Sequence, residues 1–270
     1  MSIGVAVHVG LNNLSETWYG QRATLRGAEN DARAMMRIAT AKGFQPKPFL
    51  GDDAKARTVR PAILAVAREL FSGDSLLLTF AGHGWPVKDT SGDEPSGMDQ
   101  TWCLFERLVI DDEIYFCLSK FRAGVRILVI SDSCNSGSVI EIERPEAPQD
   151  TSAAGSTVAH RNRQLPTSAH RSLVRKRRAI YNGVPQKRDP VLASVILLAA
   201  CQDQQKALDG FPDGRFTAAL LRVWRDGSFQ GSLREFFEAI RDGMPSDQTP
   251  NWYPLGEPNS TFEGSPPFSL

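Results

Sequence analysis

Nearly continuous apolar runs alternate with segments of helical spacing along the first half of the chain. Ile3–Val9, Ser75–Phe80 and Val125–Ile130 are typical of strands that are buried on both faces of a parallel sheet. Leu25–Lys42 and Val59–Leu70 instead repeat their apolar side chains every three or four residues, which predicts amphipathic helices. This order predicts an α/β fold with a mostly parallel central sheet and helices on both faces.

A second ordered region follows a long polar segment. Residues 141–190 are rich in Pro, Ser, Gln and basic side chains, and the stretch from Arg161 to Arg188 holds nine Arg or Lys and no acid. Low hydrophobicity with a run of like charge predicts a flexible linker. Beyond it, Val191–Ala200 predicts another buried strand, and helical spacing returns between Phe216 and Ile240.

Composition narrows the class of protein. The chain has 270 residues, of which 41% are hydrophobic, and its formal net charge is zero, so it can form a core and has no overall attraction to polyanions. No run is long enough to span a membrane, and Met1–Gly10 lacks a signal-type leader, so we expect a cytoplasmic protein with no membrane partner. The four cysteines show no zinc-ligand spacing; they are Cys103, Cys117, Cys134 and Cys201.

Two strands of the predicted sheet end in residues that can do chemistry. Cys134 follows the strand Val125–Ile130, and His83, flanked by glycines, follows Ser75–Phe80. Ligands and reactions gather at the carboxyl edge of parallel sheets, where these two side chains are expected to meet. An imidazole can take the proton of a thiol and later protonate a leaving amine, so we predict that Cys134 is a nucleophile and His83 its base.

The two motifs Gly82-His83-Gly84 and Asp132-Ser133-Cys134-Asn135-Ser136-Gly137, with the histidine 51 positions before the cysteine, resemble those of caspase-like peptidases. The Asp-x-Cys form is similar to the metacaspase branch, although Asn135 stands where most metacaspases have His. Ala200–Gln204 and Gly214–Thr217 resemble the small-subunit region of the same family. The resemblance implies a caspase-like fold, with residues 1–270 as one domain that comprises a large-subunit-like part (1–140), the linker (141–190) and a small-subunit-like part (191–270).

Substrate-binding residues follow in part from the resemblance. It implies that the main-chain N–H groups of Gly84 and Cys134 form an oxyanion hole, and that Asp31 lines the substrate pocket. Asp132 lies two residues before Cys134, so an extended backbone places both side chains on one side. Asp203 is a third candidate for the pocket. Carboxylates that converge on a recessed site favour a guanidinium or ammonium, so we predict cleavage after Arg or Lys.

The resemblance also implies a calcium site outside the active site. Its acidic positions match Asp99, Asp111, Asp112 and Glu141, and hard cations bind several carboxylate oxygens. Calcium would be an activator, and no cofactor is expected for the chemistry itself. The alternative for Asp111 and Asp112 is that they are acids at the start of a helix, where the helix dipole favours them.

An arginine-directed peptidase with a basic linker would be its own nearest substrate, so self-processing between Arg161 and Arg188 is expected. The partners expected are peptides or proteins with Arg or Lys at the cleavage site, and the chain is expected to be a monomer. A nucleic-acid role for Arg175–Arg178 is disfavoured because no aromatic residue interrupts that cluster. Two alternatives stay open: a catalytically silent caspase-like scaffold, and an Asp-specific protease, which would need a basic pocket.

Overall fold

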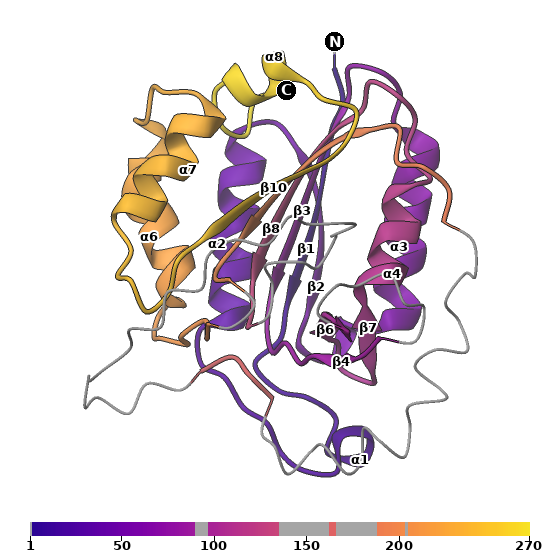
Figure 1. The fold of residues 1–270 in the computed structure, drawn as a ribbon, viewed down its shortest axis with the longest axis vertical. Helices are drawn as coiled ribbons and strands as arrows, with labels where there is room; N and C mark the ends of the chain where they lie inside the picture. The colour runs from indigo at the N-terminus through magenta and orange to yellow at the C-terminus, as the bar shows by residue number, and fades with distance from the viewer. Residues whose placement is uncertain (1, 90–96, 135–161, 166–187, 203–204) are drawn as a thin grey trace.

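The core of the protein is a six-stranded sheet (Figure 1). The computed structural model describes residues 2–89, 97–134, 162–165, 188–202 and 205–270. In spatial order the strands are β10 (Asn251–Gly256), β9 (Ser194–Ala199), β8 (Arg126–Asp132), β3 (Ser75–Ala81), β1 (Gly4–Gly10) and β2 (Gln45–Leu50). All neighbouring pairs are parallel except β10 with β9. The predicted mostly parallel sheet is confirmed, and strands from both sides of the 141–190 segment share it.

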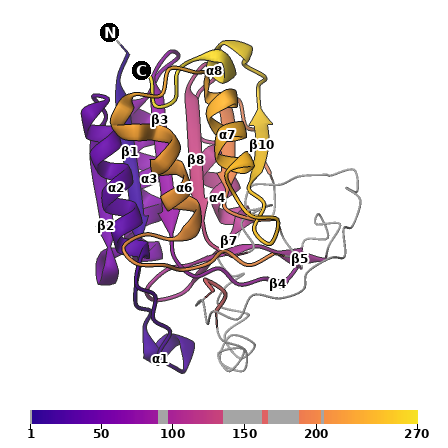
Figure 2. The same ribbon diagram turned by 90° about the vertical axis from the view of Figure 1, so that its left-hand side faces the viewer.

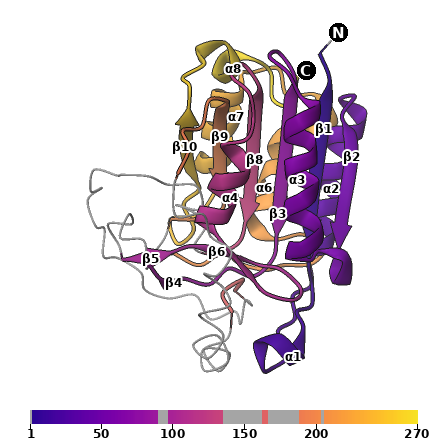
Figure 3. The same ribbon diagram turned by 90° about the vertical axis from the view of Figure 1, so that its right-hand side faces the viewer.

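Helices cover both faces of this sheet. The first face carries α2 (Ala28–Ala41), α6 (Arg215–Trp224) and α7 (Leu233–Asp242), which Figure 2 shows in front of the strands. The second face carries α3 (Ala56–Glu69) and α4 (Asp111–Leu118), which Figure 3 shows from the opposite side. Shorter helices and turns complete the chain: α1 (Glu16–Tyr19), η1 (Gly51–Asp53), η3 (Arg225–Gly227) and α8 (Ser260–Gly264).

Burial on both faces explains why the central strands read as continuous apolar runs. Every residue of β1 and β3 is buried, since side chains alternate between the two helical layers. At Gly10, a Cβ would lie 2.6 Å from the Cβ of Ala32 in α2, so only glycine allows the helix to pack this close to the end of β1. The protein therefore has two main hydrophobic clusters, one between the sheet and the helices of each face.

The edge of the sheet next to β9 is formed by β10. The C-terminal Phe268 packs in the core on the α7 side. Pro254 interrupts β10 and lacks an N–H group, which an edge strand tolerates because one side of it has no partner strand. Among the described residues, no helix is both long and apolar enough to cross a lipid bilayer.

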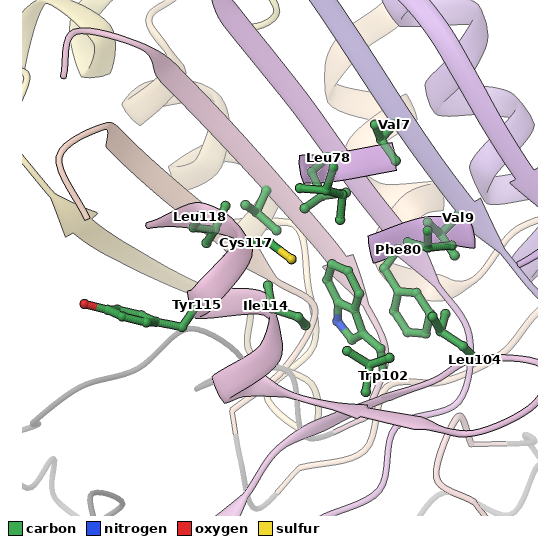
Figure 4. Packing of buried hydrophobic residues seen from close by; sticks show 14 of the residues in the cluster. Val7, Val9, Leu78, Phe80, Trp102, Leu104, Ile114, Tyr115, Cys117 and Leu118 are labelled. Atoms are coloured by element: carbon green, nitrogen blue, oxygen red, sulfur yellow. The ribbon is translucent and has the colours of Figure 1, made fainter. Parts of the chain in front are cut away.

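Two small hairpins lie at the carboxyl edge of the parallel strands. They pair β4 (Val87–Lys88) with β5 (Met98–Asp99) and β6 (Thr101–Cys103) with β7 (Leu108–Ile110). Trp102 of β6 stacks on Phe80 with ring centroids 4.7 Å apart, and Figure 4 shows the pair beside the side chains of α4. The β6–β7 hairpin thus packs against the carboxyl end of β3.

Candidate active site

Cys134 and His83 lie at the carboxyl ends of two adjacent strands. β8 and β3 pair from Ser75 with Arg126 to Ala81 with Asp132, and beyond the last pair the N–H of Gly82 donates to the carbonyl of Asp132 at 3.3 Å. This hydrogen bond joins the first residue after β3 to the last residue of β8, so the loops that follow the two strands start side by side. Cys134 is fully buried and His83 nearly so.

The β6–β7 hairpin holds the histidine loop in place. The N–H of Cys103 donates to the carbonyl of His83 at 3.0 Å, and the indole Nε1 of Trp102 donates to Oγ of Ser131 at 3.0 Å. Between these contacts, Gly84 lies so close to the cysteine loop that a Cβ would be 2.0 Å from the carbonyl oxygen of Cys134. Only glycine fits there, so its N–H can face the site without a side chain in the way.

A short piece of the 141–190 segment crosses this site. Arg163 is fully buried, and its main-chain N–H donates to the carbonyl of Ala207 at 2.8 Å. Its carbonyl oxygen accepts the N–H of Gly84 at 3.0 Å and lies 3.2 Å from Nδ1 of His83. Because a carbonyl oxygen only accepts, the latter contact requires the imidazole proton on Nδ1. The segment was expected to be a flexible linker throughout, and for 162–165 this is wrong.

The side chain of Arg163 enters a pocket of three buried carboxylates. Its guanidinium forms a short ion pair with Asp31, lies 3.0 Å from Oδ1 of Asp132 and lies 3.5 Å from Oδ1 of Asp209. Nη1 also donates to the main-chain oxygen of Asp132 at 2.7 Å, whereas Oδ1 of Asp132 accepts no hydrogen bond from the described residues and meets the guanidinium as an ion pair only. Each of the four side chains is at most 2% exposed, and a planar guanidinium suits such a fork of acceptors.

The protein fixes each carboxylate by a second contact. Asp31 accepts the N–H of Gly214 at 3.0 Å, and Asp132 accepts both the N–H and the hydroxyl of Thr217, at 3.1 and 2.7 Å. Asp209 accepts the N–H groups of Arg26 and Gly27, at 2.8 and 3.2 Å, where α2 begins. The three acids are therefore oriented by main-chain N–H groups and the Thr217 hydroxyl as well as by Arg163.

Burial dominates the protonation of the site. It raises the pKa of the Cys134 thiol well above its usual value, and nearby Cys201 adds to this, whereas the charge of Arg163 acts against it. Burial also lowers the pKa of His83 to about 4. The pKa of Asp31 is raised, by burial first and by Asp132, while Arg163 opposes the shift. With the segment in place, the cysteine is a neutral thiol and the histidine a neutral imidazole.

Cys134 and His83 are not hydrogen-bonded to each other, although the structure describes both. The thiol donates to the carbonyl of Ala207 at 3.4 Å, and Nε2 of His83 has no hydrogen-bond partner among the described residues. Both residues instead contact the main chain of Arg163. The two candidate catalytic groups thus both lie against the main chain of Arg163.

The other predicted residues fall into two groups. Asp203, proposed for the pocket, and Glu141, proposed for calcium, lie outside the described residues. Asp111 instead accepts the N–H groups of Gln100 and Asp112, at 2.8 and 2.9 Å, as expected of an acid at a helix start.

The described candidates for calcium do not make a metal site on their own. Asp112 forms a short ion pair with Arg188, whose guanidinium also lies over Tyr115. Within the described parts of the chain, no three His, Cys, Asp or Glu side chains are grouped so that they could hold a metal ion. Calcium activation therefore stays a prediction.

Sequence reasoning missed Asp209 and Arg163. Asp209 lies six positions after Asp203, the residue that was predicted for the pocket. Nothing in the sequence around Asp209 marks it as a pocket residue. Arg163 is one of nine basic residues in its stretch and carries no local signature. Only the path of the chain distinguishes it from its neighbours.

The fold is α/β with a mostly parallel sheet, and two adjacent strands end in a cysteine and in a glycine-flanked histidine. These features define the class of caspase-like proteins. The family model described as the caspase domain matches residues 3–257. The chain therefore belongs to the caspase domain family, and its caspase-like fold is confirmed.

Individual relatives support this assignment. Metacaspase-1 of Saccharomyces cerevisiae is 28% identical over 250 residues, which cover 80% of this chain and 56% of the yeast protein, so the chain spans little more than half of that relative. A crystal structure of a Geobacter sulfurreducens protein is 40% identical, covers 99% of both chains and has a TM-score of 0.84. Caspase-1 of Spodoptera frugiperda, at 12% identity, 94% and 86% coverage and a TM-score of 0.56, shares the fold.

Proposed function

We propose that the chain is a cysteine endopeptidase that cleaves after arginine or lysine and that its first substrate is its own Arg163–Gln164 bond. The observation that carries this proposal is the position of Arg163. Its side chain fills the three-carboxylate pocket while its carbonyl lies between the N–H of Gly84 and the imidazole of His83. A basic residue bound in this way has the contacts that a substrate needs on the acyl side of the cleaved bond.

The chemistry uses four groups. His83 takes the proton of the Cys134 thiol, and the sulfur attacks the carbonyl carbon of the basic residue. The carbonyl oxygen becomes an oxyanion, which the N–H of Gly84 stabilises together with the N–H of Cys134. The carbon–nitrogen bond then breaks, and His83 returns its proton to the leaving amine. Water, deprotonated by His83, hydrolyses the thioester and restores the thiol.

The preference for a cation follows from the charge of the pocket. Three carboxylates face one guanidinium, and removing that guanidinium would leave uncompensated charge in a buried site. An aspartate in the same place would add a fourth negative charge. This disfavours the alternative of an Asp-specific protease.

A catalytically silent scaffold is the second candidate. It is favoured by the absence of a direct hydrogen bond between the described residues Cys134 and His83 and by the high pKa of the buried thiol. In that case Arg163 would be a permanent structural ion pair. The two candidates differ in whether the Arg163–Gln164 bond is ever cut.

The test is to incubate the purified full chain, with and without calcium, and to identify new termini by mass spectrometry. The proposal expects a fragment that begins at Gln164 in the wild type and none in Cys134→Ala. The same protein should cleave peptides with Arg or Lys at the cleavage site and leave matched Asp peptides intact. An intact chain and intact peptides under both conditions would leave the scaffold as the function.

A further inference from the structure

Beyond Arg163, the same segment runs alongside Gly84 and forms an isolated bridge with it. The N–H of Gly84 donates to the carbonyl of Arg163 at 3.0 Å, and the N–H of Leu165 donates to the carbonyl of Gly84 at 3.2 Å. Together these bonds make a parallel bridge between Gly84 and Gln164. One glycine therefore binds the residue before the proposed cleavage site and also the second residue after it.

The burial of the side chains alternates along this segment. Arg163 and Leu165 are buried, whereas Asn162 and Gln164 are half-buried, as expected when successive side chains of an extended chain point in opposite directions. Leu165 is 1% exposed and belongs to the apolar core cluster that includes Trp85 and Trp102. The residue in the acidic pocket, Arg163, and the residue in the apolar cluster, Leu165, are thus two positions apart along the chain.

We propose that the site has an apolar subsite for the second residue after the cleaved bond, and that it selects substrates with an aliphatic side chain there. Leu165 occupies this subsite in the uncut chain. The inference rests on the proposed function, because a substrate must replace Arg163 and Leu165 together along Gly84. It adds a requirement on the leaving side of the bond, which the acidic pocket cannot impose.

The main chain explains why the two requirements are coupled. The backbone of Gly84 binds a substrate on both sides of the bond, so a basic residue seated in the acidic pocket brings its second following residue to the apolar cluster. A polar side chain there would lose its hydrogen bonds to water without a replacement. An aliphatic side chain would gain the burial that Leu165 now has.

The test uses the self-processed full chain and internally quenched peptides with one arginine. One series places Leu, Met, Asn or Asp at the second position after arginine; Asn matches Leu in size without its apolar surface. A control series makes the same changes one residue further on. A second control is an arginine amide whose leaving group is a fluorophore, which has no residues after the cleaved bond.

The expected result is that kcat/KM for the Leu and Met peptides exceeds that for Asn and Asp by about tenfold or more, as burial of one aliphatic side chain allows. The control series should vary by less than about threefold, because its position lies outside the bridge. Cleavage of the arginine amide with equal rates for Leu, Asn and Asp peptides would refute the subsite and leave the proposed function intact. No cleavage of any arginine substrate would refute both.

Discussion

The acidic pocket can be closed sterically by one methyl group, at Gly214. A Cβ on this residue would lie 2.3 Å from Nη2 and 2.7 Å from Cζ of Arg163, well inside van der Waals contact. The backbone of Gly214 has φ −64° and ψ 156°, which alanine adopts without strain, and its N–H would still reach Asp31. The variant Gly214→Ala should therefore fold and should exclude a guanidinium specifically.

The magnitude follows from the contacts that are lost. A guanidinium pushed back by about 1 Å to normal contact distance loses its hydrogen bonds to Asp31 and Asp209 but stays within ion-pair distance of Asp31. Losing a charge-assisted hydrogen bond of this kind costs about 1.5–3 kcal/mol, so kcat/KM for arginine peptides should fall by about 10- to 10²-fold. Lysine has no atoms equivalent to Nη2, so lysine peptides should lose less and the Arg/Lys ratio should fall.

The assay compares kcat/KM for matched arginine and lysine peptides in the wild type, Gly214→Ala and Gly264→Ala. Gly264 is a suitable control, since an added Cβ there meets nothing within 4 Å and α8 lies at the opposite end of the sheet (Figure 1). Urea unfolding of the uncut chain checks the fold, and in an Arg163→Ala background Gly214→Ala should cost little extra stability. Unchanged arginine kinetics in a folded Gly214→Ala protein would show that this pocket does not receive the basic residue.

Three further outcomes are expected. Arg163→Lys should still yield a fragment beginning at Gln164, whereas Arg163→Gln should not, as mass spectrometry of incubated protein would show; a cut at this bond in the Gln variant would contradict the role of the acidic pocket. Burial lowers the pKa of His8 to about 4, so its neutral form stabilises the fold fully above about pH 6.5, and this contribution is lost as the pH falls toward 4. Relative to His8→Asn, the wild type should therefore lose stability in urea on acidification, and parallel pH profiles would refute this. Trp102→Phe keeps the stacking on Phe80 but removes the bond to Ser131, so the free energy of unfolding should fall by about 1–2 kcal/mol, and a change in kcat/KM without that loss would contradict a supporting role.

Local pattern was sufficient for the layers of the fold. β1, β3, β8 and β9 are buried on both faces, so their sequences are mostly apolar and predict strands readily. β10 was missed because an exposed edge strand does not need apolar residues and can include Pro254. The β6–β7 hairpin was missed because its three-residue strands are too short for an alternating pattern.

The candidate site was predictable where it depends on strand ends. Cys134, His83 and Asp132 follow or end buried strands, so their position at one edge follows from the sheet alone. Asp209 and Arg163 lie in irregular segments, and they reach the site through long-range contacts with α2 and with Gly84. No periodicity encodes such contacts, so only the fold could assign them.

In the proposed mechanism, the segment that offers the first bond for cleavage also lies against the nucleophile and its base. The carbonyl of Arg163 lies 3.2 Å from Nδ1 of His83, and burial is the main reason why the thiol pKa is raised and the imidazole pKa is about 4. Proton transfer between them would create a thiolate and an imidazolium. These two ions need water or direct contact with each other to be stable, and the buried, separated side chains of Cys134 and His83 have neither in this arrangement. In the proposed mechanism, the same contacts place the carbonyl of Arg163 in position, and His83 must come within hydrogen-bond reach of the sulfur before the reaction can start. After the proposed cleavage, a new cation would meet carboxylates that the contacts to Gly214, Thr217 and the start of α2 keep oriented.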